Sequence, residues 1–438
     1  MSARYRSPRP AATRILPQVF DLERATALGG LNSLHRFLRR YDLGGELRRR
    51  FGRAKAAWAN WPLDRVLGVL LDLAFAGVER LYHYAELERE PLLCTLHRSE
   101  RLPDLTTLYR DLRRFEDPAL AGELDALLAG VVRRGLAGQP RVVLDIDSMV
   151  NTLYGAQEGA ALGPNPHKPG RVSYHPLLAR DRVSDLIVHQ QLRPGDSGSA
   201  TDIVPFLHRT IDLVREDAPH RPVLARLDAG FEGEQTLSVL ERRRVGYVVK
   251  LRATAEVAAV ASARGASAWR AVELEGEGEL QVTAFVWQRP SWSRPRVVVA
   301  LRKREMERLQ GHLFDELGWS YSLFVTDRDW APDEVARFYD KRADVERTVC
   351  ELRNDLAIDQ VPSASFAANA ADFALKTLAR NLLVLYRDQG LKLATRDRVM
   401  TLRRRFVWIA GRIVCHAGRR VLRLAAGHPL ALRASGAT

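Results

Sequence analysis

The stretch Arg141-Val-Val-Leu-Asp-Ile-Asp147 decides the fold, because a run of aliphatic residues here ends in two carboxylates. A turn-rich break, Gly135–Pro140, precedes it and separates it from a different sequence pattern upstream. A short apolar run of this kind predicts a strand buried in a sheet. Asp145 and Asp147 are two residues apart, so on a strand both side chains point to the same face. Carboxylates are costly to bury unless they are paired or bind a cation.

The residues that follow predict further strands at Val172–Leu178 and Leu186–Leu192, and then two helix–strand units. The first unit joins a helix at 201–215 to a strand at 222–227, and the second joins a helix at 233–243 to a strand at 246–251. Three strands that can form a meander, followed by helix, strand, helix and strand, predict an α/β fold with an RNase H-like core. A plain repeat of βαβ units would show a different order.

The regions around this core differ in pattern and divide the chain into five predicted parts. Alternating apolar residues with Gly and Pro between them predict a β-rich insertion within the core. The tail from Arg396 carries ten arginines and one acidic residue, Asp397, so we expect phosphate contacts there, with Arg403, Arg404 and Arg405 as candidates. The predicted parts are a helical DNA-binding domain (1–138), the first part of the core (139–252), the insertion (253–330), the second part of the core (331–390) and a basic helical C-terminal region (391–438).

Composition limits the classes of partner. The 438 residues carry a net charge of +14, which predicts a polyanionic partner, either nucleic acid or an anionic membrane. Cys94, Cys350 and Cys415 form no CxxC pair, so we expect a reduced cytoplasmic protein. No apolar run reaches the roughly 20 residues that span a bilayer. Met1–Arg14 is basic without an apolar segment, so a secretory signal is not expected.

A second stretch, Tyr339–Arg353, provides a further carboxylate. Placed on one helix, Tyr339, Arg342, Glu346 and Arg353 share a stripe about 60° wide. A solvated helix face with an Arg342–Glu346 ion pair is the alternative interpretation. Asp228 follows the predicted strand at 222–227, at the carboxyl edge where α/β active sites form. Carboxylates from two strands and a helix can hold two divalent ions, and oxygen ligands favour Mg²⁺, with Mn²⁺ as a substitute.

Six motifs in this order resemble those of DDE transposases of bacterial insertion sequences. The resemblance is to the branch with a β-rich insertion before the catalytic Glu and a Tyr-Arg-Glu-Lys signature around it, and it covers roughly residues 140–390. The motifs are Asp145-Ile-Asp147-Ser148, Gly155-Ala-Gln157-Glu158-Gly159-Ala160, Tyr174-His-Pro176-Leu177, Leu192-Arg-Pro-Gly195, Arg226-Leu-Asp228-Ala-Gly230-Phe231 and Tyr339-x2-Arg342-x3-Glu346-x6-Arg353.

The resemblance implies a retroviral-integrase-like fold and metal-dependent cut-and-paste DNA transposition, by a homodimer on paired DNA ends in the bacterial nucleoid. It implies that Asp147, Asp228 and Glu346 are the catalytic metal ligands, with Asp145 as the rival first ligand. Tyr339 and Arg342 match residues that contact phosphates near the transposon end. Arg353 stands where the family usually has Lys, so a single contact becomes a forked one.

The same branch implies a hairpin DNA intermediate, for which a flipped base needs a stacking partner. Trp287, Trp292 and Trp319 in the insertion are the candidates, and packing in the sheet is the alternative for each. Three other functions stay open: an RNase H-fold nuclease that cuts without joining, a domesticated DNA-binding protein, and a basic protein of the membrane surface. The sequence predicts double-stranded DNA as the partner and indicates no protein partner.

Overall fold

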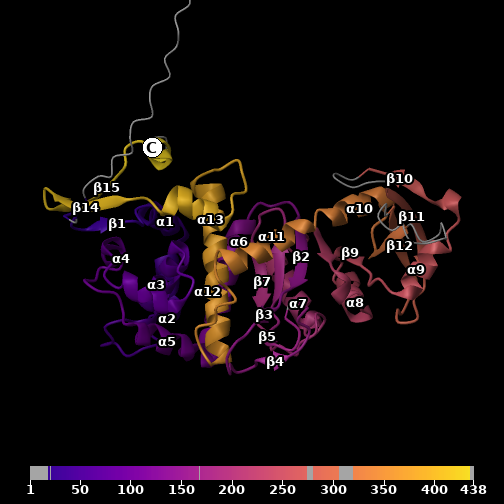
Figure 1. Ribbon diagram of the computed structural model, residues 1–438, viewed down its shortest axis with the longest axis horizontal. Helices are drawn as coiled ribbons and strands as arrows, with labels where there is room; N and C mark the ends of the chain where they lie inside the picture. The colour runs from indigo at the N-terminus through magenta and orange to yellow at the C-terminus, as the bar shows by residue number, and fades with distance from the viewer. Residues whose placement is uncertain (1–17, 20, 167, 274–279, 305–318, 435–438) are drawn as a thin grey trace, which may run out of the picture.

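The computed structural model describes residues 18–19, 21–166, 168–273, 280–304 and 319–434. Figure 1 shows three parts along the longest axis: a helical part, a central sheet flanked by helices, and a smaller β-rich part. None of the helices among the described residues is both long and apolar enough to cross a membrane.

The N-terminal helices surround one long helix that comes from far along the chain. That helix, α12 (Phe366–Leu385), packs against α3 and α6, and nearly all of its residues are buried. The helical part therefore shares its hydrophobic core with residues beyond 366, although the sequence places its boundary at 138. The N-terminal helices are α1 (Leu31–Leu38), α2 (Leu43–Phe51), α3 (Leu63–Ala76), α4 (Pro91–Leu96), α5 (Leu105–Leu112) and α6 (Pro118–Leu136).

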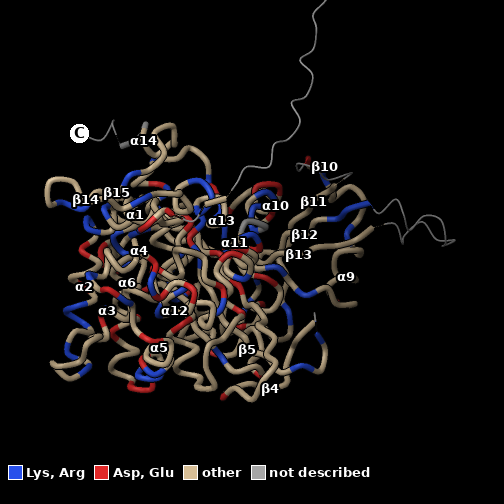
Figure 2. The backbone as a smooth tube through the Cα atoms, turned by 60° about the vertical axis from the view of Figure 1, so that its left-hand side comes forward, with Lys and Arg blue, Asp and Glu red and all other residues tan. Residues whose placement is uncertain are grey.

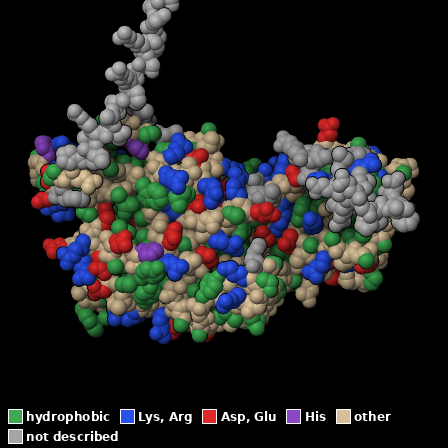
Figure 3. Space-filling model, in the orientation of Figure 1, with side chains coloured by type: hydrophobic (Ala, Val, Ile, Leu, Met, Phe, Trp, Pro, Cys, Tyr) green, Lys and Arg blue, Asp and Glu red, His purple; other side chains and the backbone are tan. Residues whose placement is uncertain are grey.

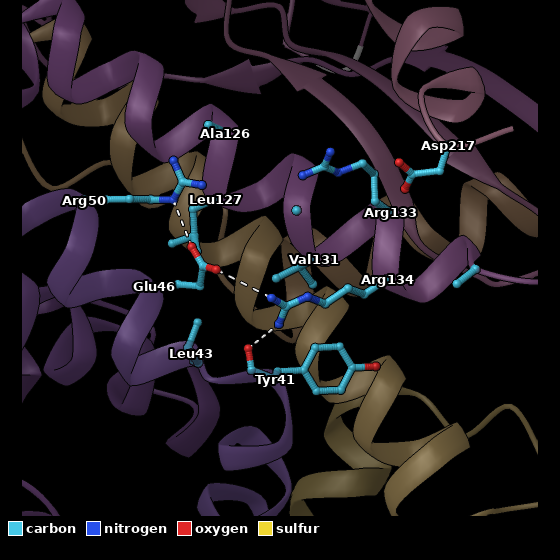
Figure 4. Close-up of a pocket in the computed structure, with 12 residues that line it drawn as sticks. Tyr41, Leu43, Glu46, Arg50, Ala126, Leu127, Val131, Arg133, Arg134 and Asp217 are labelled. Atoms are coloured by element: carbon cyan, nitrogen blue, oxygen red, sulfur yellow. Dashed lines mark hydrogen bonds and ion pairs between the residues drawn. The ribbon is translucent and has the colours of Figure 1, made fainter. Parts of the chain in front are cut away.

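A cavity lies between α2 and α6 (Figure 4). Arg134 of α6 reaches across it to the carbonyl of Tyr41 and to Glu46, and Arg50 also pairs with Glu46. These contacts join the two helices, so we regard the cavity as a packing gap of the helical part.

The central sheet has the strand order predicted for an RNase H-like core. Its five core strands are β2 (Val142–Ser148), β6 (Leu177–Asp181), β7 (Ile187–Gln191), β8 (Val223–Leu227) and β9 (Gly246–Lys250). They lie in the order β7-β6-β2-β8-β9. β6 is antiparallel to both of its neighbours, whereas β2, β8 and β9 are parallel. Helices α7 (Ile203–Arg215) and α8 (Glu234–Arg242) make the crossovers, which confirms the predicted fold class.

The insertion extends this sheet. It contains β10 (Arg270–Val272), β11 (Leu280–Trp287), β12 (Arg296–Arg304) and β13 (Trp319–Thr326), all antiparallel, with β13 joined to β9. The β-rich prediction is therefore confirmed, although a helix, α9 (Ala255–Ser262), precedes these strands. A separate small sheet of β3 (Asn151–Thr152), β4 (Ala161–Leu162) and β5 (Val172–Tyr174) follows β2.

The predicted single helix over Tyr339–Arg353 is wrong, because the chain breaks there into α10 (Pro332–Asp340) and α11 (Ala343–Asn354). At the break, Arg342 N bonds to the Tyr339 carbonyl, and Val345 N bonds to the Arg342 carbonyl. The side chain of Arg342, which lies in these tighter turns, is buried. Tyr339 and Glu346 therefore belong to different helices.

The C-terminal region is helical only in part, which corrects the prediction for 391–438. Helix α13 (Val399–Leu402) continues as a π-helical turn to Val407, but β14 (Gly411–His416) and β15 (Arg419–Leu424) then form a hairpin before α14 (Pro429–Ala434). Ala417 and Gly418 have φ of 49° and 74°, which suits the two-residue turn of a hairpin. Strand β1 (Ala25–Thr26) pairs with β14 and completes a three-stranded sheet.

One buried acid in the helical part links two histidines. Asp72 on α3 accepts hydrogen bonds from Nε2 of His35 and Nε2 of His97, each at 2.7 Å. Burial disfavours the charged form of His35, but the charge and the hydrogen bond of Asp72 outweigh burial and raise its pKa. Burial likewise opposes ionisation of Asp72, yet His35 and His97 hold its pKa below the ordinary value.

We expect this cluster to make stability depend on pH. Because the pKa of His35 is raised in the folded state, its contribution is complete below about pH 6.5 and is lost as pH rises through the folded pKa. The midpoint of thermal unfolding should therefore fall less between pH 6 and pH 8 in His35→Gln than in the unmodified protein. His220→Gln, on an exposed residue, is the control. An equal pH dependence in His35→Gln and the unmodified protein would contradict the expectation.

Candidate active site

Two carboxylates meet where neighbouring parallel strands end. The register of β2 and β8 pairs Ile146 with Leu227, so Asp147 and Asp228 are adjacent at the carboxyl edge of the sheet. The Oδ1 atom of Asp228 accepts from the backbone N–H of Gly230 at 2.9 Å, and Oδ1 of Asp147 accepts from that of Ser148 at 3.0 Å. These short loops fix both side chains at the strand ends.

The Asp147 carboxyl is held in an unfavourable electrostatic environment. Its side chain is only 14% exposed. Burial raises the pKa of Asp147, Arg342 lowers it and Asp228 raises it again, so that it reaches about 6. Two like charges close together in a buried place are costly, and such sites are commonly functional. Arg342 offsets part of that cost, since its guanidinium lies 3.0 Å from Oδ1 of Asp147.

The break between α10 and α11 brings two predicted residues to this pair. Arg342 also donates to the carbonyl of Ile146 at 3.1 Å, while its Nε has no hydrogen-bond partner among the described residues. Tyr339 packs its ring against Phe324, and burial raises the pKa of its phenol to about 12. Tyr339 therefore stays a neutral phenol, and Arg342 a cation, beside the two carboxylates.

Asp145 has a different environment, although it lies on the same strand. It is fully buried, and both of its oxygens are bound by Arg226, at 2.7 and 2.8 Å. Arg180 approaches one of them at 3.4 Å. A carboxylate held bidentately by a buried arginine has little capacity for a metal ion. The geometry therefore argues against Asp145 as the rival first ligand.

Glu346 is not brought to the Asp147–Asp228 pair. It lies on α11, is exposed, and makes no hydrogen bond or ion pair with the described residues. Among all the residues that the structure describes, no three His, Cys, Asp or Glu side chains converge as a metal site would require. The donor chemistry of Asp147 and Asp228 fits a divalent cation, with two oxygen ligands and strong mutual repulsion, and the third carboxylate would have to join them.

The other arginines predicted to contact phosphates differ in their exposure to solvent. Arg353 is half-buried and donates to the carbonyl of Val150 at 3.1 Å. Arg404 and Arg405 are exposed, and Arg405 pairs with Asp397. The prediction for Arg403 is wrong, because its side chain is buried and donates to backbone carbonyls, among them Ala74 and Phe75.

The tryptophans of the insertion are mainly packing residues. Trp292 is 3% exposed and packs edge-on against Trp287, with Arg296 over its ring, so the prediction that it stacks on a flipped base is wrong. Trp287 is half-buried. Trp319 is also half-buried, with Arg302 over one face at 4.3 Å. The stacking role of these two stays a prediction.

Sequence reasoning missed Ser199, which lies at the centre of the strand ends. Its hydroxyl is 3.2 Å from that of Ser148, next to Asp147. A Cβ on Gly230 would be 2.7 Å from Cβ of Ser199 and 3.1 Å from Oδ1 of Asp228, so only glycine fits there. The cluster of small residues Gly195–Ala200 could have signalled a close approach of this loop.

The chain is similar to known proteins in sequence family and in fold. A family model described as "Transposase DDE domain group 1" matches residues 12–435. Among solved structures, a piggyBac transposase synaptic complex with hairpin DNA matches with a TM-score of 0.45 and 12% identity, over 86% of this chain and 78% of that one. No curated protein matches the sequence.

The different partners of Asp145 and Asp147 predict effects of different size on stability. Asp145→Asn leaves Arg226 and Arg180 buried without a counter-charge, which should cost about 3–5 kcal/mol of unfolding free energy. Asp147→Asn removes the counter-charge of the buried Arg342 but also relieves the repulsion with Asp228, so it should lower the unfolding midpoint less than Asp145→Asn does. Asp228→Asn should behave like Asp147→Asn. Equal destabilisation by all three substitutions, measured by thermal or urea unfolding, would refute the distinction.

Proposed function

Because the chain belongs to the Transposase DDE domain group 1 family and is by that membership a transposase, we propose that it moves an insertion sequence. It would cut DNA at the terminal inverted repeats of the element and join the freed 3′-OH ends to target DNA. The observation that carries this proposal is the Asp147–Asp228 pair, held at adjacent strand ends beside Arg342.

We propose that Asp147 and Asp228 hold divalent cations, Mg²⁺ with Mn²⁺ as substitute, and that Glu346 is the third ligand. Bound divalent ions supply activation of the attacking oxygen and stabilisation of the leaving oxygen. Glu346 follows Arg342 by one helical turn on α11, so a small movement of that helix could present it to the pair. Asp145 is left out of this set because Arg226 occupies it.

Arg342 has two roles in this proposal. In the structure it neutralises Asp147. When Asp147 acts as a ligand instead, the guanidinium is released and can bind a DNA phosphate, for which its planar set of donors is well suited. Tyr339 would lie beside it as a hydrogen-bond donor, because its phenol is neutral at physiological pH. Arg353 and the exposed Arg404 and Arg405 are proposed as further phosphate contacts.

We also propose that the protein acts on double-stranded DNA as a homodimer on paired ends, in the cytoplasm. A hairpin at the DNA ends is the proposed route, with Trp287 or Trp319 stacking on a flipped base. The described residues give no support for a membrane-spanning helix.

The catalytic assignment can be tested by three single substitutions. Asp147→Ala, Asp228→Ala and Glu346→Ala should each abolish Mg²⁺-dependent cleavage of a duplex that carries the terminal repeat, by a factor of about 10³ or more, since each removes a metal ligand. DNA binding should be retained. Glu351→Ala, on the same helix, is unsuitable as a control because Glu351 is buried in an ion pair, so Cys350→Ala, at an exposed free cysteine of that helix, is used instead. Full cleavage by Glu346→Ala would remove that residue from the set.

The second test separates a transposase from a nuclease that only cuts. Pre-cleaved ends with a 3′-OH should be joined to a circular target DNA in the presence of Mg²⁺, and ends with a 3′-dideoxynucleotide should not. A nuclease would cut the repeat and leave the target intact. A domesticated DNA-binding protein would show neither activity, and its biological effect would survive Asp228→Ala.

A further inference from the structure

The C-terminal hairpin β14–β15 presents two chemically different faces. Cross-strand partners share a face, so the pair Ile413–Leu422 marks the inner one. Ile413 is buried and Leu422 packs against the core of the helical part. The opposite face consists of three cross-strand pairs, Arg412 with Arg423, Val414 with Val421 and His416 with Arg419. Its arginines and histidine are all exposed.

This outward face lacks compensating negative charge. Residues 398–438 contain nine arginines and no Asp or Glu. Among the described residues, Arg412, Arg419 and Arg423 make no ion pair. Arg412 donates from Nε to the backbone carbonyl of Glu23, at 3.3 Å. Many arginines elsewhere in the chain pair with a carboxylate, as Arg296 does with Glu234 and Glu241.

The cross-strand register makes the arrangement unfavourable for the protein alone. Arg412 lies directly opposite Arg423, and like charges at such positions destabilise a hairpin. Departures from local rules of this kind are expected at functional sites. A polyanion laid across the pair would turn this repulsion into attraction.

We propose that the outward face of β14–β15 is a DNA-binding ribbon that enters the major groove of double-stranded DNA. A two-stranded ribbon fits that groove, with arginines reaching the phosphates or guanine edges, while Val414 and Val421 can contact thymine methyl groups. The inference rests on the proposed function only for the choice of DNA as the polyanion.

The hairpin is connected to the candidate active site through α13 and α11. Helix α13 leads into the hairpin and is joined to α11, because Val399 N donates to Glu351 and Arg398 pairs with Asp355. Figure 3 shows Lys and Arg side chains gathered over α13 and α11, and Figure 2 marks basic residues along the hairpin. In Figures 1 and 2 the hairpin extends away from α11, so it would hold DNA at a distance from the cleaved bond.

The test is the affinity of the full chain for a 30-bp DNA duplex, measured in EDTA at several salt concentrations. In R412A/R419A/R423A we expect affinity to fall by about tenfold to a hundredfold at ~0.1 M salt, and the slope of log affinity against log salt to decrease by about 2 to 3. The unfolding midpoint should stay unchanged or rise, because repulsion between Arg412 and Arg423 is removed.

A matched control removes the same charge elsewhere. Arg53, Arg110 and Arg113 lie on or beside α2 and α5, which Figures 1 and 2 place across the helical part from the hairpin. R53A/R110A/R113A should weaken binding by less than threefold. An RNA duplex should be indifferent to the hairpin variant, because side chains cannot enter its narrow major groove.

Equal weakening by the two triple variants, unchanged DNA binding by the hairpin variant, or an equal loss for the RNA duplex would each overturn the proposal. Because binding is measured without divalent ions, failure of the proposed DNA chemistry would leave these results unaffected.

Discussion

A buried network of ion pairs holds the sheet and the helices of this protein together. Asp145 on β2 is bound by Arg226 of β8 and approached by Arg180 of β6. Arg180 also binds Asp185, which in turn accepts from Arg380 and Arg387 at 3.1 and 2.9 Å. A charge in such a place is tolerable only when it is paired and hydrogen-bonded. The network therefore fixes these elements relative to one another, because a displaced partner would leave a charge without compensation.

This network also gives the two aspartates of β2 different partners. The period of two along β2 places Asp145 and Asp147 on one face, yet Arg226 lies beside Asp145 on the neighbouring strand. Arg226 takes both oxygens of Asp145 and continues to the carbonyl of Phe338 on α10. Asp147, two residues closer to the strand end, accepts from the N–H of Ser148, pairs with Arg342 and lies near the charge of Asp228. The inner carboxylate is thus structural, whereas the outer one lies at the strand end, where we propose that it exchanges Arg342 for a cation.

Local patterns predicted most of the core strands and placed Asp147 and Asp228 at strand ends. The strand predicted at Val172–Leu178 is instead divided between β5 and β6, which lie in different sheets. Other features involve contacts between residues far apart in the sequence, which local patterns do not reveal. The side chain of Arg342, at the helix break, binds Asp147, nearly 200 positions away, and the buried side chain of Arg403 donates to carbonyls of α3. The hairpin had a local signal in Gly418, which lies between Ile413-Val414 and Val421-Leu422, but the basic composition of the region obscured it.

The distribution of carboxylates is a better marker of a DNA surface here than the distribution of arginines. Six of the largest fully buried side chains are arginines, among them Arg180, Arg226 and Arg403, so a net charge of +14 does not locate the bound phosphate. Where acids are interspersed, arginines serve to stabilise the fold, as around Asp185. On the outward face of the hairpin, Arg412, Arg419 and Arg423 have no carboxylate partner among the described residues, whereas Arg398 and Arg405 pair with Asp355 and Asp397. In the proposed complex with DNA, the phosphate backbone supplies the missing counter-charge.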